Sequence, residues 1–199
     1  MIKFVFDLDG TVTSEETLPI IASHFGIEKD IQKLTHETVS GNIPFVEGFI
    51  KRVHLMANYP VDEINELLEK TPLYKRIWEF INNNREQCII ATGNLDCWVD
   101  GLCRKVGCES RTSKAIVEDN SVKKIDEILR KEKVIKELQE QGATVVMIGE
   151  GNNDFEAMRQ ADISIACGLT HQPAVSVLGI TDYVVYSEEA LCRQLNQLL

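Results

Sequence analysis

The amino-acid sequence predicts an α/β fold, in which a parallel sheet carries helices on both faces and a small all-helical segment is inserted after the first strand. Three observations lead to this prediction. Short apolar runs alternate with stretches of helical periodicity over residues 71–199, which is typical of a parallel sheet. Residues 16–70 contain helical patterns only. Polar loops follow three of the apolar runs, where sheets of this kind bind ligands.

The expected strands are short and strongly apolar. The first covers residues 2–6 and runs directly into the turn-forming sequence Asp-Leu-Asp-Gly-Thr. Two more buried strands are expected at residues 86–91 and 143–148, the first ending at the polar turn 92–94 and the second at the loop 149–154. The remaining expected elements are strands at 115–117, 163–166 and 183–186, and helices at 73–83, 95–106, 127–141, 153–160, 172–178 and 188–198.

The inserted segment interrupts the alternation directly after the first strand loop. Pro60 and Pro72 mark boundaries within and after it. We expect residues 1–15 and 71–199 to form the core domain and residues 16–70 to form a cap that closes over the sheet. The helices expected in this cap are 16–25, 28–40, 43–57 and 61–70.

Composition excludes several kinds of partner. The chain has 199 residues and a formal net charge of −10, which argues against nucleic acid or an anionic membrane as a ligand. No stretch approaches the ~20 apolar residues of a membrane span, and the N-terminus lacks a signal-peptide layout. The six cysteines show no metal-binding pattern, and together with the missing export signal this leads us to expect reduced thiols in a cytoplasmic protein. We expect the protein to be a monomer or a homodimer.

Two aspartates directly follow the first strand. Asp7 and Asp9 are two positions apart, so on an extended segment their side chains share one face. Two such carboxylates can carry out different steps of a phosphoryl transfer. One attacks phosphorus, and the other protonates the leaving alcohol and then activates water. The alternative is a capping turn, which Asp and Thr commonly form.

The loop Gly149-Glu150-Gly151-Asn152-Asn153-Asp154 supplies two further carboxylates at another strand end. Mg²⁺ prefers oxygen ligands, and Asp7, Glu150 and Asp154 together could hold it beside a phosphate. The alternative is a helix N-cap formed by Asn or Asp.

Other positions could hold an anion. Thr92, with Gly93 and Asn94, offers a hydroxyl and successive N–H groups at a strand end, although an ordinary turn would look the same. Lys131 could neutralise both a nucleophile and phosphoryl oxygens. The alternative for Lys131 is a solvated lysine, and Lys133 is the fallback for this role.

In the inserted segment, Phe45, Phe49, Arg52 and Met56 form one helical stripe. Arg52 either extends to water or binds a buried anion such as a substrate carboxylate. Glu16 is either a first-turn helix acid or a ligand for a substrate ammonium. The histidines show no metal-binding spacing and are assigned no role; they are His24, His36, His54 and His171.

Taken together, these motifs resemble the haloacid dehalogenase superfamily over nearly the whole chain. The four motifs of that superfamily stand here as Asp7-Leu8-Asp9-Gly10-Thr11, Thr92-Gly93, Lys131 and the loop 149–154, in the expected order and spacing. The resemblance implies a Rossmann-like core, a small helical cap and one Mg²⁺. The implied metal ligands are Asp7, the backbone carbonyl of Asp9, Glu150 and Asp154.

Within that superfamily the chain looks most like phosphoserine phosphatases. Glu16 falls nine positions after Asp7, as in those enzymes, and the segment from Gly41 to Phe45, running on to Arg52, is similar to their substrate-reading helix. The resemblance implies a phosphatase that hydrolyses a small phosphomonoester, such as O-phosphoserine, through a phospho-aspartate on Asp7. The implied catalytic residues are Asp7, Asp9, Thr92 and Lys131, and the implied substrate-binding residues are Glu16, Phe45, Arg52, Thr11, Gly93, Asn94 and Asn153.

The sequence departs from this pattern at two motifs. The fourth motif usually begins Gly-Asp-Gly, whereas here Glu150 keeps the charge and adds a methylene. The second usually reads Ser-Gly-Gly, whereas here Asn94 brings a larger polar side chain. Two other functions therefore stay open: a phosphotransferase that uses the same intermediate, and a non-catalytic binder of a phosphorylated metabolite.

Overall fold

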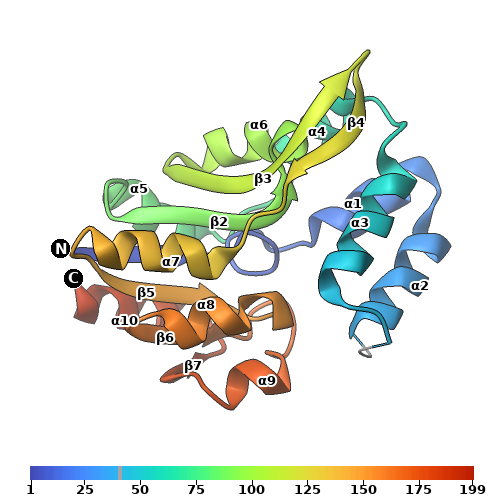
Figure 1. Ribbon diagram of the computed structural model, residues 1–199. Coiled ribbons are helices and arrows are strands. Elements are labelled where there is room, and N and C mark those ends of the chain that lie inside the picture. Colours follow the sequence, from blue (N-terminus) through green and yellow to red (C-terminus); the bar gives the residue numbers. More distant parts are fainter. Residues whose placement is uncertain (40–41) are drawn as a thin grey trace.

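The computed structural model describes residues 1–39 and 42–199, apart from the side chains of Val39 and Phe45. Its described part contains a seven-stranded sheet in the order β4-β3-β2-β1-β5-β6-β7 (Figure 1). Neighbouring strands are parallel except for β3 and β4, which pair antiparallel. The predicted α/β fold is thus confirmed. The strands are β1 (Ile2–Phe6), β2 (Cys88–Leu95), β3 (Glu109–Glu118), β4 (Ser121–Glu127), β5 (Thr144–Gly149), β6 (Ile163–Cys167) and β7 (Tyr183–Val185).

Helices cover both faces of the sheet (Figure 1). One face packs against α5 (Lys75–Asn83), α6 (Asp96–Val106) and α10 (Glu188–Leu198), and the other against α7 (Lys131–Glu140) and α8 (Phe155–Gln160). The 3₁₀ turn η1 (Asn152–Asp154) precedes α8, and the short helix α9 (Val175–Leu178) packs beside both.

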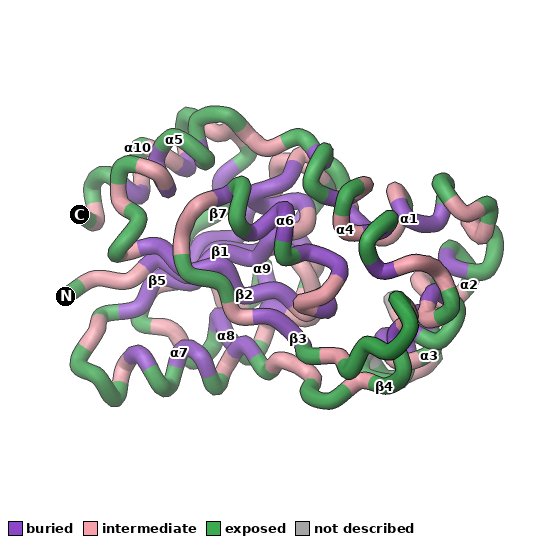
Figure 2. The backbone as a smooth tube through the Cα atoms, turned by 90° about the horizontal axis from the view of Figure 1, so that it is seen from above, coloured by how far each residue is buried: buried purple, intermediate pink, exposed green. Residues whose placement is uncertain are grey.

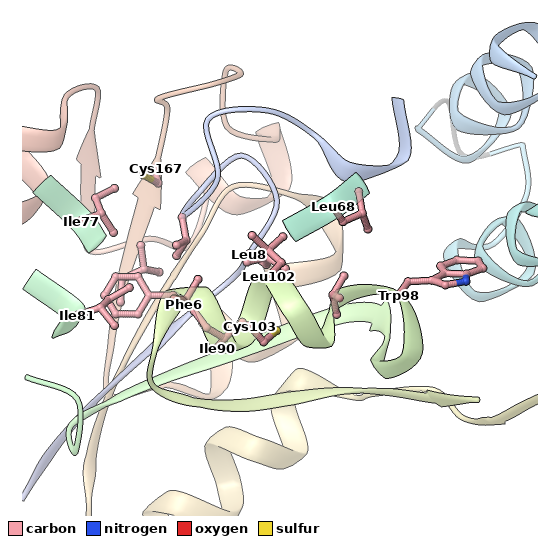
Figure 3. Packing of buried hydrophobic residues seen from close by; sticks show 14 of the residues in the cluster. Phe6, Leu8, Leu68, Ile77, Ile81, Ile90, Trp98, Leu102, Cys103 and Cys167 are labelled. Carbon is pink, nitrogen blue, oxygen red and sulfur yellow. The ribbon is translucent and has the colours of Figure 1, made fainter. Parts of the chain in front are cut away.

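The alternation of side chains along β1 divides the core between these two faces. Phe4 and Phe6 point into the cluster under α5, α6 and α10, whereas Val5 points into the cluster under α7. The rings of Phe4 and Phe80 meet edge to face, with their centroids 5.4 Å apart. Because β1 is buried on both faces, its sequence is an almost continuous apolar run. Figure 3 shows the first cluster, in which Phe6 lies among side chains of α5 and β2, namely Ile77, Ile81 and Ile90.

The inserted segment forms α1 (Thr17–Phe25), α2 (Glu28–Val39), α3 (Phe45–Met56) and α4 (Val61–Glu69), close to the four expected helices. The end of the expected helix 28–40 falls at residues outside the described part. Helices α1, α2 and α3 lie beyond the end of the sheet where β1, β2 and β5 finish (Figures 1 and 2). Helix α4 instead packs against α6, where Asn65 donates a hydrogen bond of 3.2 Å to the carbonyl of Cys97. Among residues 1–39 and 42–199, no helix is both long and apolar enough to cross a membrane.

Two predicted elements need correction. Strand β2 does not stop at residue 91 but continues to Leu95, with a register irregularity between Thr92 and Leu95. Pairing with β3 extends the strand, so the motif 92–94 belongs to the strand end rather than to a loop. The short strand expected at 115–117 is part of a long β-hairpin, β3–β4, whose other residues are mostly exposed and form no apolar run.

Candidate functional site

The amino group of Lys131 lies between two carboxylates at the carboxyl ends of β1 and β5. Its Nζ is 2.6 Å from Oδ1 of Asp7 and 2.6 Å from Oδ1 of Asp154. All three residues are buried, and Asp154 is fully so. Burial alone would lower the pKa of Lys131, but the charges of Asp154 and Asp7 outweigh it and raise the pKa above its usual range. Lys131 therefore carries a proton here. The fallback Lys133 is exposed and has no such partners among those that the structure describes.

Asp154 organises the loop that follows β5. Its Oδ2 accepts hydrogen bonds from the backbone N–H groups of Glu150 (3.0 Å) and Gly151 (2.9 Å), while Oδ1 accepts from Lys131. The carboxylate thus fixes the loop on one side and the lysine on the other. A Cβ on Gly149 would lie 2.5 Å from Oδ2 of Asp154, so this close approach requires glycine at position 149.

Asp9 connects the first strand loop to the inserted segment and to β2. Its Oδ1 accepts a 2.7 Å hydrogen bond from the N–H of Thr17, the first residue of α1, and its Oδ2 accepts a 2.6 Å bond from Nδ2 of Asn94. Asn94 Nδ2 is also 3.0 Å from the Thr17 hydroxyl. The side-chain amide of Asn94 therefore contacts both Asp9 and Thr17. The sequence suggested only an anion-binding turn at this position and did not indicate these contacts.

The acidic side chains of this region crowd one another. Burial, followed by the charge of Asp154, raises the pKa of Asp7 to about 7, although Lys131 opposes the shift. Burial raises the pKa of Asp9 as well. For Glu150, burial and the charge of Glu16 raise the pKa to about 9, and for Glu16, burial and the charge of Asp9 raise it to about 8. If all of these carboxyls were ionised, their negative charge would exceed what Lys131 neutralises, so the region favours either protons or a bound cation.

Gly10 allows this crowding. Its φ of +69° lies in the left-handed region that favours glycine. A Cβ at this position would lie 2.6 Å from Oε1 of Glu150 and 3.0 Å from Oε1 of Glu16. The two glutamate carboxylates therefore pass over the bare backbone of Gly10.

The donor set fits a hard divalent cation such as Mg²⁺. Oε2 of Glu150 is buried and has no hydrogen-bond partner among the described residues, which is costly for a charged oxygen unless a ligand completes it. The carboxylates of Asp7 and Asp154 come from adjacent strand ends, and oxygen ligands are those that Mg²⁺ accepts. The hydroxyl of Thr11 is likewise buried without a hydrogen-bond partner in this part of the structure.

The other predicted residues are positioned as follows. Thr92 is buried at the end of β2, and its hydroxyl accepts a 3.2 Å hydrogen bond from the N–H of Asn94. Gly93 has open space where a Cβ would stand, and Asn153 is half-buried in η1.

Arg52 is buried on α3, where burial lowers the pKa of its guanidinium. The side chain of Phe45 lies outside the described part, and so does Gly41 of the same motif.

One residue near this cluster was assigned no role from the sequence. His171, in the loop after β6, lies with its Nε2 3.5 Å from Oε1 of Glu16. Ligand atoms of Glu16, Glu150 and His171 all lie within 4.8 Å of one another. No spacing pattern relates these three positions, because the fold alone brings the loop after β6 beside the loops after β1 and β5.

A family model described as haloacid dehalogenase-like hydrolase matches residues 4–162. The chain belongs to this hydrolase family. The resemblance inferred from the four motifs is thereby confirmed, and the matched range runs from the first strand through the loop that carries Asp154.

Individual relatives of this hydrolase include phosphoserine phosphatases. The phosphoserine phosphatase of Methanocaldococcus jannaschii is 26% identical over 81% of this chain and 83% of its own length. A 2-hydroxy-3-keto-5-methylthiopentenyl-1-phosphate phosphatase from Lysinibacillus sphaericus is 24% identical over 80% of this chain and 79% of its own. A solved phosphoserine phosphatase, described as a phospho-aspartyl intermediate analogue, covers all of both chains with a TM-score of 0.80 at 20% identity. That structural match establishes a shared fold.

Proposed function

We propose that this hydrolase is a Mg²⁺-dependent phosphatase that cleaves a small phosphomonoester through a phospho-aspartate on Asp7. The proposed substrate is O-phosphoserine or a similar amino-acid-like phosphate. The observation that carries the proposal is the buried ammonium of Lys131, 2.6 Å from a carboxylate oxygen of Asp7 and of Asp154. A buried cation fixed between two strand-end carboxylates offers the positive potential that an anionic substrate requires in a protein of net charge −10.

In the first proposed step, a carboxylate oxygen of Asp7 attacks phosphorus in line with the ester oxygen. The P–O bond to the alcohol breaks as the bond to Asp7 forms, and Asp9 gives its proton to the departing oxygen. Burial raises the pKa of Asp9, which favours the protonated form that this role needs. Lys131 and the Thr92 hydroxyl hold the phosphoryl oxygens.

In the second step, Asp9 removes a proton from water as that water attacks phosphorus. The bond between phosphorus and Asp7 breaks, inorganic phosphate leaves, and both aspartates return to their starting states. Asp9 is well held for both steps, because Thr17 and Asn94 each donate a hydrogen bond to its carboxylate.

Mg²⁺ would be held by Asp7, the backbone carbonyl of Asp9, Glu150 and Asp154. When bound, it supplies positive charge beside the phosphoryl oxygens. The buried Oε2 of Glu150 supports this assignment, because it is an oxygen without a hydrogen-bond partner among the described residues.

We propose that residues 16–70 act as the cap of a core formed by residues 1–15 and 71–199. Glu16 lies at the junction, as the residue before α1, and in the proposal it binds a substrate ammonium. Arg52 and Phe45 on α3 would bind the carboxylate and pack over the substrate. Thr11, Gly93, Asn94 and Asn153 complete the proposed substrate site in a cytoplasmic enzyme, monomeric or homodimeric, without nucleic-acid or membrane partners.

The first test is phosphate release from a panel of phosphomonoesters with and without an α-amino acid group, at saturating Mg²⁺. We expect phosphoserine to be among the best substrates, and we expect Asp7→Asn to reduce its turnover by at least ~10³-fold, since no nucleophile remains. Asp100→Asn, at an exposed acid on α6, is the matched control and should keep wild-type turnover. Persistent Mg²⁺-dependent turnover in the Asp7 variant would assign the nucleophile elsewhere.

The substrate assignment has a named competitor. The relative from Lysinibacillus sphaericus, almost as similar as the archaeal one, acts by its description on a sugar-derived phosphate without an amino acid group. If the panel shows that phosphates lacking an α-carboxylate react faster than phosphoserine, the amino-acid specificity is wrong while the phosphatase proposal stands. Adding alcohols and looking for new phosphate esters separates a phosphotransferase from a phosphatase.

A further inference from the structure

We infer that Tyr74 and Thr170 are positioning residues for Asp9, and that they act through the backbone carbonyl of Gly10. Neither residue belongs to the motifs found in the sequence. The inference rests on the proposed function, because it concerns the proton transfers assigned there to Asp9. It explains how the turn that carries Asp9 is held in place by two segments far away in the chain.

The hydroxyl groups of Tyr74 and Thr170 form a directed chain of hydrogen bonds. Oγ1 of Thr170 donates to the carbonyl oxygen of Gly10 over 3.0 Å, and the Tyr74 hydroxyl lies 3.0 Å from the same Oγ1. A threonine hydroxyl has a single proton, and that of Thr170 is used by the carbonyl. The Tyr74 hydroxyl is therefore the donor to Thr170, and the chain of bonds ends on Gly10.

The turn that carries Asp9 is closed by hydrogen bonds of its own. The carbonyl of Leu8 accepts from the N–H groups of Val12 (2.9 Å) and Thr13 (3.0 Å) and from the Thr13 hydroxyl (3.1 Å). The N–H of Gly10 donates a 3.2 Å bond to the Thr13 hydroxyl. These bonds restrain the peptide groups on both sides of Asp9, so the turn behaves as one unit that must be attached to the core as a whole.

Tyr74 and Thr170 provide that attachment at two points. The N–H of Tyr74 donates a 3.0 Å hydrogen bond to the carbonyl of Val12, and its hydroxyl is linked through Thr170 to the carbonyl of Gly10. Tyr74 lies directly before α5, where the chain returns from the inserted segment, and Thr170 lies in the loop after β6. The fold alone brings these two residues beside the first strand loop.

Gly10 is the position at which such support is needed. Its φ of +69° suits glycine, and the missing Cβ leaves its backbone free to adopt other conformations. The bond from Thr170 restricts this freedom. Since Thr17 and Asn94 each donate a hydrogen bond to the carboxylate of Asp9, the side chain and the backbone of this residue are held by separate contacts.

The restraint matters because Asp9 has to meet two different oxygens in the proposed reaction, that of the leaving alcohol and that of the attacking water. A displacement of ~1 Å in an active site can cost about 10²-fold in rate. Loss of the contact at Gly10 lets the turn tilt by a part of that distance. We therefore expect proton transfer by Asp9 to slow by about tenfold.

The test compares two substrates that differ in their need for a proton, at saturating Mg²⁺. The leaving oxygen of an alkyl phosphate needs protonation, whereas p-nitrophenyl phosphate releases a stabilised phenolate that does not. We expect Thr170→Val to lower kcat/KM about tenfold for the fastest alkyl phosphate of the substrate panel, and less than about twofold for p-nitrophenyl phosphate. Thr170→Ser keeps the hydroxyl and should restore the wild-type ratio of the two values.

Two further variants make the comparison specific. Tyr74→Phe should give the same selective loss at a smaller size, because Thr170 still bonds to Gly10. Combined with Thr170→Val it should cause no additional loss, since the Tyr74 hydroxyl acts through Thr170. Thr181→Val is the matched control, because its hydroxyl bonds instead to the carbonyl of Ser164 on β6, and it should keep the wild-type ratio.

A thermal melt checks that each variant is folded. Equal losses on the two substrates in folded Thr170→Val would indicate a structural role only and overturn the inference, as would unchanged kinetics. Both results leave the phosphatase proposal intact, because the wild type still turns over. A wild-type chain that releases phosphate from no phosphomonoester, p-nitrophenyl phosphate included, would refute the proposed function and this inference with it.

Discussion

Lys131 places one positive charge between two buried carboxylates, each 2.6 Å from its Nζ. Replacing it with Met would remove the cation and leave Asp7 and Asp154 facing each other without compensation. Breaking a buried pair by removing one partner typically costs about 3–5 kcal/mol, and we expect a loss of that order in the free energy of unfolding. We also expect phosphate release to vanish. Urea denaturation and a turnover assay measure the two effects.

Lys133→Met is the matched control for this change. Lys133 lies two positions along the same helix and is exposed, so its replacement should alter the free energy of unfolding by less than about 0.5 kcal/mol. Similar denaturation curves for the two variants would contradict the assigned role of Lys131.

At the residue scale, sequence reasoning identified residues that the fold indeed gathers. Ligands of parallel sheets bind at the carboxyl ends of the strands, and this rule predicted that the polar residues at those ends lie together. The structure gathers four of them at one edge of the sheet: Asp7, Lys131, Glu150 and Asp154. The roles given to them remain predictions. His171 could not be found in this way, because an isolated histidine in a loop carries no spacing signal.

At the element scale, Asn120 connects the β3–β4 hairpin to the inserted helices. It has a φ of 59° in the two-residue turn of the hairpin. Its carbonyl accepts a hydrogen bond from the N–H of Val61, and its Oδ1 accepts from the N–H of Asp62. Helix α4 begins after Pro60, which offers no side-chain cap, so Asn120 supplies the cap from a distant segment.

Asn120→Gly keeps the backbone freedom and removes this cap. We expect it to lower the free energy of unfolding by about 1 kcal/mol, which is a fall of about 2–4 °C in Tm for a chain of this size. Asp119→Gly is the paired control, because Asp119 also has a positive φ, of 48°, and lies beside the cap rather than forming it. It should leave Tm unchanged or raise it. Equal losses in the two variants would mean that the turn, and not the cap, carries the effect.

The same region shows where element prediction failed. Strands β1 and β5 were placed within one residue, because burial on both faces makes them continuous apolar runs. The hairpin was missed apart from three residues, because most of its side chains are exposed and its sequence is rich in charge. The end of β2 was misplaced because Thr, Gly and Asn are turn-forming types, whereas pairing with β3 keeps them in the strand.

At the scale of the whole molecule, the net charge of −10 and the acidic groups around Asp7 act in the same direction. Each carboxylate brought into this region raises the pKa of its neighbours, so the chain alone is less stable than one with a cation bound. A ligand that binds only the folded state stabilises it by ~2.7 kcal/mol at a hundredfold excess over its Kd. We therefore expect Mg²⁺ to raise Tm by several degrees, measured by calorimetry at constant ionic strength.

Glu150→Gln tests the origin of that effect. Burial raises the pKa of Glu150 to about 9, so at neutral pH folding without metal must protonate this carboxyl, a cost that the neutral Gln avoids; without metal the variant should therefore be as stable as the wild type or more so. With Mg²⁺ the order should reverse, because the variant loses a charged ligand while the wild type gains the binding energy. Glu156→Gln, at an exposed acid on α8, should follow the wild type in both conditions. Equal Mg²⁺-induced shifts in the wild type and Glu150→Gln would exclude Glu150 from the magnesium site.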